Sequence, residues 1–150
     1  MGPQNLRPGG PWSYRYITRL RARELKALEV QIFGVRKSAD TRAALRFFAE
    51  RRIKVHFVDL LERPASRGEL NRFAQKFGVL ALLDRESRRF DELGLAVASR
   101  SDERWLELLC EEPLLLKLPL VRFQHQLTVG AGESVWRSWT GQIESDDETP

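Results

Sequence analysis

The stretch that most constrains the fold runs from Leu28 to Ile53 and has the pattern of a strand, a polar turn and a helix. The β-rich run before Gly34 predicts the strand, and Ser38 is a favoured residue for capping the helix that follows. One face of that helix is predicted at the spacing i, i+3, i+4 and i+7 by Thr41, Ala44, Leu45 and Phe48. A second strand over residues 54–60 completes a unit in which the two strands are expected to be parallel.

Two later helices have clear start signals. Ser66 stands three residues before Glu69, which is the spacing of a capping box, and Gly78 is expected to end that helix. Ser101 opens another helix, which Pro113 closes. Short helical turns are expected between them, over residues 79–83 and 90–95. The residues expected on the buried faces of the two helices are Leu70, Phe73, Ala74, Phe77, Trp105, Leu108 and Leu109.

The C-terminal part changes to a strand pattern. Residues 118–123 and 126–129 predict an antiparallel hairpin, and residues 133–139 predict a last helix with Val135, Trp136 and Trp139 on one side. We expect the tryptophans at 105, 136 and 139 to form a core cluster. The element order predicts an α/β fold with a four-stranded mixed sheet flanked by helices, in the arrangement βαβ, helical insertion and ββα.

The distribution of charge separates the chain into parts. The net charge is +4, but residues 1–27 hold six basic side chains against one acidic one, so the remainder carries −1. We expect residues 1–27 to be a basic extension, residues 28–140 the folded domain and residues 141–150 an acidic disordered tail. The extension is open to three interpretations: a flexible leader, translated sequence upstream of a natural start near Leu28, or an arm that binds RNA or a partner protein. Nucleic acid is therefore expected to be bound through this segment if at all.

The single cysteine, Cys110, excludes an intrachain disulfide and favours a reducing, cytoplasmic setting. No apolar run approaches the roughly 20 residues of a membrane span. Cys110 is expected to be structural, with a pKa raised by Glu111 and Glu112. His56 and His125 have no second ligand at metal spacing, so we expect no metal site.

Several segments in the same order resemble the arsenate reductase (ArsC) family, including its Spx and YffB branches. They are FGVRKS (33–38) with the helix to Ile53, RPASRGEL (63–70), FDELGL (90–95), LLCEEPLLLKLPLV (108–121) and the glycine after the hairpin. The resemblance covers about residues 28–140 and implies a thioredoxin-like fold. It also implies that Leu118–Pro119 is a cis peptide bond, facing the turn before Ser38.

The same resemblance implies where a reaction centre would lie. In this family a cysteine at the helix start attacks an oxyanion with the help of three arginines; Ser38 falls on that cysteine, and Thr41 on the second cysteine of the Spx-type CxxC. Arg67 matches one arginine, Arg85 lies one position from the second at Asp84, and Leu118 replaces the third. We therefore assign no catalytic residue and expect arsenate reductase and thiol oxidoreductase activity to be absent. A helix dipole lowers a pKa by less than about one unit, which is too little to ionise a serine.

Three roles of Ser38 remain open at this point. It can cap the helix alone, or it can join Arg36, Lys37, Arg67 and Arg85 in binding a phosphate-, arsenate- or sulfate-type anion without redox chemistry. It can also hold a glutathione thiolate, as in a diverged glutathione-dependent transferase. No other cofactor is expected. As a regulatory protein resembling the Spx branch, the chain would instead contact a partner such as RNA polymerase.

Overall fold

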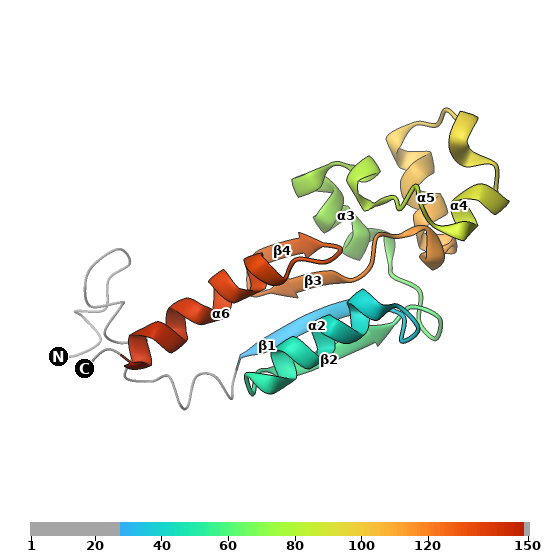
Figure 1. Cartoon of the computed structure of the whole chain (residues 1–150). Coiled ribbons are helices and arrows are strands. Elements are labelled where there is room, and N and C mark those ends of the chain that lie inside the picture. Colours follow the sequence, from blue (N-terminus) through green and yellow to red (C-terminus); the bar gives the residue numbers. More distant parts are fainter. Residues whose placement is uncertain (1–27, 149–150) are drawn as a thin grey trace.

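The computed structural model describes residues 28–148, and the expectations made for residues 1–27 lie outside that range. Its centre is a four-stranded sheet in the order β2-β1-β3-β4. The strands are β1 (Glu29–Gly34), β2 (Lys54–Asp59), β3 (Leu120–Phe123) and β4 (Gln126–Val129) (Figure 1). β1 and β2 are parallel, whereas β1–β3 and β3–β4 are antiparallel. The predicted mixed sheet is therefore confirmed.

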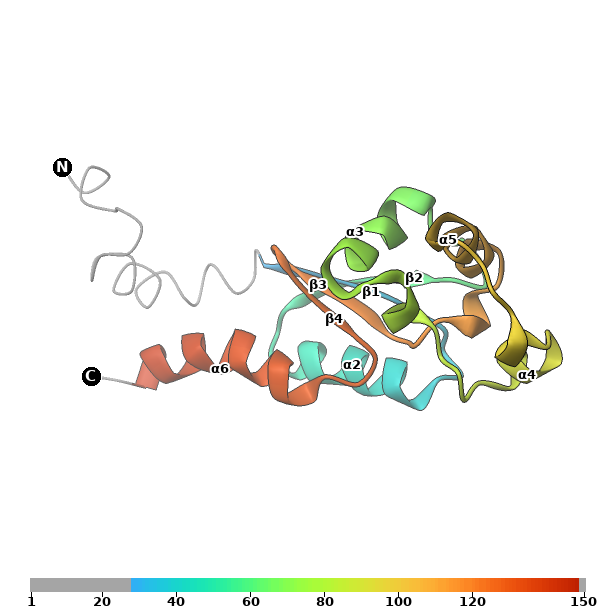
Figure 2. The ribbon, with the colours of Figure 1, turned by 90° about the horizontal axis from the view of Figure 1, so that it is seen from above.

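Helices cover both faces of the sheet, as the view along its edge shows (Figure 2). On one side lie α2 (Ala39–Glu50) and α6 (Glu133–Glu148); on the other lie α3 (Arg67–Phe77) and α5 (Asp102–Glu111). The short elements between the helices are η2 (Val79–Leu82), α4 (Arg88–Glu92), η3 (Leu95–Val97) and η4 (Pro113–Leu115). Alternate residues of β1 point to opposite faces, so Ile32 packs with the α2 side and Phe33 with the α3 side.

Serine caps fix where the helices begin. The Ser38 side chain accepts a hydrogen bond from the backbone N–H of Thr41, and Ser101 accepts one from Arg104. Ser66 and Glu69 form the complete capping box that their spacing predicts. These three starts are confirmed because a cap depends only on residues within one turn of the chain.

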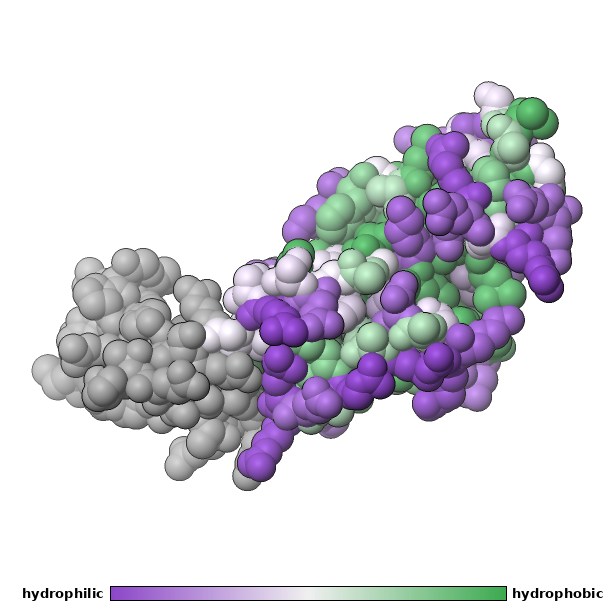
Figure 3. Space-filling view, viewed as in Figure 1, coloured by the Kyte–Doolittle hydropathy of each residue, from purple (hydrophilic) through white to green (hydrophobic). Residues whose placement is uncertain are grey.

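Packing between elements corrects several expected faces. Phe77, expected to be buried, is 38% exposed, and Val135, expected on the same side as Trp136 and Trp139, is 41% exposed. On α5 the buried leucine beside Trp105 is Leu106, whereas Leu108 is partly buried. Leu80 of the adjoining η2 is exposed as well. Figure 3 shows apolar residues at the surface in the region of α3. The helical period of apolar residues does not indicate how wide a face of the helix is covered by neighbouring elements. The observed burial at these positions therefore differs from the expected burial.

The three tryptophans do not form one cluster. Trp105 packs in the core on the α3–α5 side of the sheet, and Trp136 and Trp139 pack in the core on the α2–α6 side. All three are buried as expected. The expectation of a single cluster is wrong because the sheet separates the two cores.

The last helix is longer than predicted. It was expected over residues 133–139, but α6 continues to Glu148, so the acidic tail expected to be disordered from residue 141 is helical up to that residue. Its packed first half supplies the helix nucleus, and each further residue then adds one hydrogen bond at little additional cost.

Within residues 28–148 no helix is long and apolar enough to cross a membrane. The same described range contains no group of three or more His, Cys, Asp or Glu side chains placed to hold a metal ion.

Candidate functional site

The turn between β1 and α2 places Ser38 at the helix N-terminus. The Ser38 N–H donates to the carbonyl of Val35 (3.0 Å), and the Ser38 carbonyl accepts from the N–H of Arg42 (3.0 Å). Its Oγ accepts from the N–H of Thr41 at 3.2 Å. Because Oγ serves as an acceptor in the cap, the hydroxyl hydrogen of Ser38 is left to donate to a bound group. The sequence prediction of a capped turn is confirmed.

Thr41 lies beneath this turn rather than in it. The side chain is 0% exposed, and its Oγ1 has no hydrogen-bond partner within the described part of the chain. It packs directly against Gly34, where an added Cβ would meet Thr41 Oγ1 at 2.5 Å. The hydroxyl at position 41 therefore faces the strand and is closed to solvent, so it takes no part in binding at the surface.

Arg36 and Lys37 are exposed in the turn itself. The Arg36 guanidinium lies over the ring of Phe57 on β2, 4.8 Å from its centroid, and the Arg36 carbonyl accepts from Arg42 Nη1 at 2.7 Å. These two contacts hold Arg36 against the sheet edge. Lys37 is therefore the more available cation beside Ser38.

Arg67, the arginine expected to assist from α3, points toward α5. Its guanidinium nitrogens lie 3.8 Å from Glu103 and 3.5 Å from Glu107, and it lines a cavity of about 680 Å³ between α3 and α5. Arg85 is exposed in the stretch between η2 and α4. Neither arginine forms a hydrogen bond with Ser38 within the described part of the chain, so the structure does not join the five predicted residues through hydrogen bonds. Only Arg36, Lys37 and Ser38 are neighbours through the turn.

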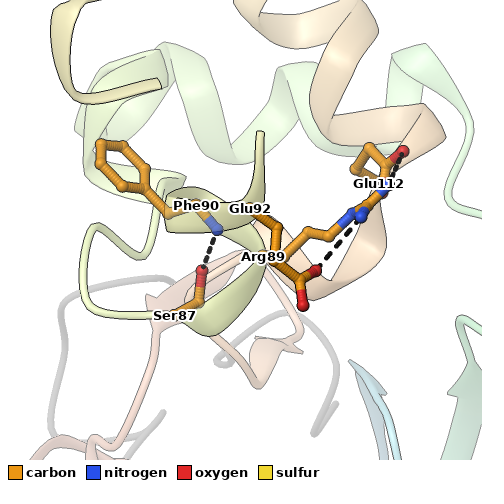
Figure 4. A network of polar contacts seen from close by, with 5 residues as sticks. All are labelled: Ser87, Arg89, Phe90, Glu92 and Glu112. Carbon is orange, nitrogen blue, oxygen red and sulfur yellow. Dashed lines mark hydrogen bonds and ion pairs between the residues drawn. The ribbon is translucent and has the colours of Figure 1, made fainter. Parts of the chain in front are cut away.

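The charged stretch around residues 85–90 contains an ion-pair network that the sequence did not indicate (Figure 4). Arg89 Nε and Nη2 donate to the two carboxylate oxygens of Glu112 at 2.7 and 3.1 Å, and Nη1 donates to Glu92 at 3.2 Å. The Ser87 hydroxyl caps α4 by accepting from the N–H of Phe90, whose side chain is buried. This stretch is therefore not wholly solvated. Glu112 lies 23 residues after Arg89 in the sequence, so no local sequence pattern indicates that the two residues pair.

This network is expected to make the free energy of unfolding depend on pH. The hydrogen bonds from Arg89 lower the pKa of the Glu112 carboxyl below its ordinary value of 4.5. A carboxyl with a lower pKa when folded stabilises the protein above the unfolded pKa, and loses that contribution as the pH falls through the folded value. We expect the difference in unfolding free energy between wild type and Glu112→Gln, measured by urea denaturation, to be constant near neutral pH and to shrink below about pH 4.5. Arg89→Gln should remove this dependence, because the hydrogen bonds that lower the pKa of Glu112 are then absent.

Cys110 has the character expected of a structural thiol. Burial raises its pKa, and Glu111 and Glu107 add to that effect, while Arg67 opposes it. Glu112, which was also expected to raise this pKa, is not among the groups that raise it most, and its carboxylate binds Arg89. A thiol with a raised pKa is a poor nucleophile at neutral pH.

Pro119 lies at the start of β3. The Leu118–Pro119 peptide bond is cis, which confirms that part of the expectation, and Pro119 is buried. The residue before it is the apolar Leu118, so no side-chain cation precedes the proline.

Comparison with known proteins gives the same family as the sequence resemblance. The ArsC family model matches residues 33–139. An arsenate reductase of Neisseria meningitidis serogroup A is 28% identical over 105 residues, which are 68% of this chain and 90% of that protein. A solved arsenate reductase from Vibrio cholerae is 26% identical with a TM-score of 0.61, covering 69% of this chain and 90% of that one.

A further solved structure, named YFFB protein, has a TM-score of 0.69 at 20% identity, over 74% of this chain and 98% of that one. At that identity the match shows the fold alone, and it agrees with the thioredoxin-like arrangement of sheet and helices described above. The chain belongs to the ArsC family.

Proposed function

We propose that this ArsC-family protein is a non-redox member that binds a phosphate-, arsenate- or sulfate-type anion at the N-terminus of α2. The observation that carries the proposal is the Ser38 cap. The Thr41 N–H is used by Ser38 Oγ, whereas the N–H groups of Ala39 and Asp40 are in the first turn, where no intrahelical acceptor exists. Together with the Ser38 hydroxyl they form a donor set suited to an oxyanion.

The charges around the turn favour a modest affinity. Lys37 is exposed beside Ser38, and Arg36 adds positive charge from its place over Phe57. Asp40 opposes an anion from the first turn of the helix. Arg67 would contribute only after leaving Glu103 and Glu107, and such exposed ion pairs are individually weak.

We expect sodium arsenate and sodium phosphate to stabilise the full chain against heat. A ligand at 100 times its Kd adds about 2.7 kcal/mol to the free energy of unfolding. In a thermal-shift titration at constant ionic strength, Lys37→Gln should reduce the shift, whereas Arg46→Gln, an exposed arginine of the same helix, should not. Equal shifts with sodium chloride would contradict a specific anion site.

We expect no arsenate reductase activity. A reductase of this family needs a thiolate at the helix start, and this chain has a serine there and a cysteine of raised pKa elsewhere. Serine also cannot form the mixed disulfide that glutathione would resolve. With arsenate, glutathione and glutaredoxin, the purified protein should turn over no faster than Ser38→Ala. Turnover that disappears in Ser38→Ala would overturn the non-redox assignment.

A second candidate function rests on the same hydroxyl. The free Ser38 hydrogen could donate to a glutathione thiolate, as in a diverged glutathione-dependent enzyme. Reduced glutathione would then stabilise the protein, S-methylglutathione would not, and Ser38→Ala would remove the difference. If no anion or thiol ligand shifts the melting curve, the remaining proposal is a regulatory contact with an RNA polymerase-like partner, which a pull-down tests.

A further inference from the structure

One end of the sheet face that carries α3 is polar and is not covered by any described helix. Phe33, Val58 and Leu120 lie in one row across β1, β2 and β3 and are buried in the core beneath α3 and α5. Two residues further along the strands, the same face presents polar side chains. In Figure 2 the helices on this face do not extend as far as the end of the sheet at which β1 begins.

The polar side chains form two rows in strict register. His56, Gln31 and Arg122 are direct partners across the three strands, and Lys54 pairs with Glu29 in the next row. Above them is a cavity of about 300 Å³, lined by Glu29, Gln31, His56, Arg122 and Gln124. A sheet places such side chains upright and parallel, so the positions of these groups are set by the strand register.

The two charges that line the cavity do not pair with each other. Arg122 and Glu29 are diagonal neighbours on antiparallel strands, about 7–8 Å apart, a distance that long side chains can bridge. Arg122 instead donates from Nε to the carbonyl of Gln124 at 3.3 Å, which leaves its terminal nitrogens without a partner among the described residues. A cation and an anion thus face one cavity with a gap between them.

Lys54 is the cation that pairs with the Glu29 carboxylate in the structure, so a ligand cation would have to compete with it. Its Nζ lies 3.7 Å from the Glu29 carboxylate, and both side chains are more than half exposed. Exposed pairs of this length contribute little and exchange readily with another cation. The carboxylate therefore remains available to a ligand.

We propose that this cavity binds a free α-amino acid with a polar side chain. The ligand carboxylate would accept from the terminal nitrogens of Arg122, a geometry that allows two parallel hydrogen bonds. Its ammonium would bind Glu29, and Gln31, His56 and Gln124 would offer donors and acceptors to the side chain. A simple anion satisfies only half of this arrangement, because Glu29 repels it.

Three probes separate a zwitterion from its parts. L-glutamine carries both charges, N-acetyl-L-glutamine lacks the ammonium and L-glutamine amide lacks the carboxylate. In NMR titrations of the full chain, L-glutamine is expected to shift the His56 ring signals and the Gln31 side-chain amide, with a Kd on the order of 1 mM. The two analogues are expected to leave these signals in place at the same concentration and ionic strength.

Variants then locate the site. Arg122→Gln and Glu29→Gln should each weaken L-glutamine binding by about tenfold or more, since each removes a charged partner. Arg46→Gln and Glu62→Gln, the same changes at exposed positions outside the cavity, should not. The proposal is overturned if L-glutamine causes no shift, if either analogue binds as well, or if both cavity variants bind normally.

Discussion

Replacement of Trp136 by alanine is expected to lower the free energy of unfolding by about 3–5 kcal/mol, the range for removing a large aromatic side chain from a core. Trp136 is 2% exposed, and its ring centroid lies 5.7 Å from those of both Phe47 and Phe48. Its indole N–H also donates to Thr128 Oγ1 at 2.8 Å. The substitution removes the contact that holds α6 to α2 and to the hairpin.

The measurement is urea denaturation of the full chain. A domain of this size has a total stability of about 5–15 kcal/mol, so this variant should lie close to unfolding at physiological temperature. Val135→Ala, one residue earlier on the exposed side of the same helix, should change stability by no more than about 0.5 kcal/mol. A Trp136→Ala variant within 1 kcal/mol of wild type would show that α6 does not pack as described.

Gly34→Ala is expected to be the second most damaging substitution. The added Cβ would lie 2.5 Å from Oγ1, 2.6 Å from Cγ2 and 3.1 Å from Cβ of Thr41. Thr41 is fully buried in α2 and cannot move aside, so the strand and helix must separate. Overpacking of this kind typically costs about 1–3 kcal/mol.

The partner substitution should relieve this loss. Thr41→Ala removes the two closest atoms, so the double variant should be more stable than the sum of the single effects by about 0.5–3 kcal/mol. Gly68→Ala is the matched control, because its Cβ would meet only Ser66 Oγ at 4.0 Å, and it should be neutral or stabilising. Additive losses in the double variant would contradict a direct contact between positions 34 and 41.

Local features of the fold could be predicted from the sequence. Ser38, Ser66 and Ser101 cap their helices as expected, because a cap involves neighbours along the chain. The four-stranded mixed sheet could be predicted from the sequence of elements and from the resemblance. The exposure of Phe77 and Val135 could not be predicted, because it depends on which residues other elements place against them.

The candidate site likewise has features that could be predicted from the sequence and features that could not. The turn and its cap were predictable, but the ion pairs of Arg67 with α5 and of Arg89 with Glu112 join residues far apart in sequence. The buried position of Thr41 beneath Gly34 likewise required the three-dimensional contact. A match to a family motif therefore predicts the position of a residue in the chain. The direction of its side chain depends on contacts with residues that are distant in the sequence.

The position of Arg36 over Phe57 bears on how experiments on the turn are designed. β2 is an edge strand of the described sheet. Its sequence KVHFVD offers a half-buried aromatic ring beside backbone groups that pair with no further strand within residues 28–148. Exposed strand edges of this kind are templates for intermolecular pairing, and a nearby charge protects them. Removing Arg36 would therefore favour aggregation as well as weaken anion binding. Lys37 tests the anion site without uncovering the edge.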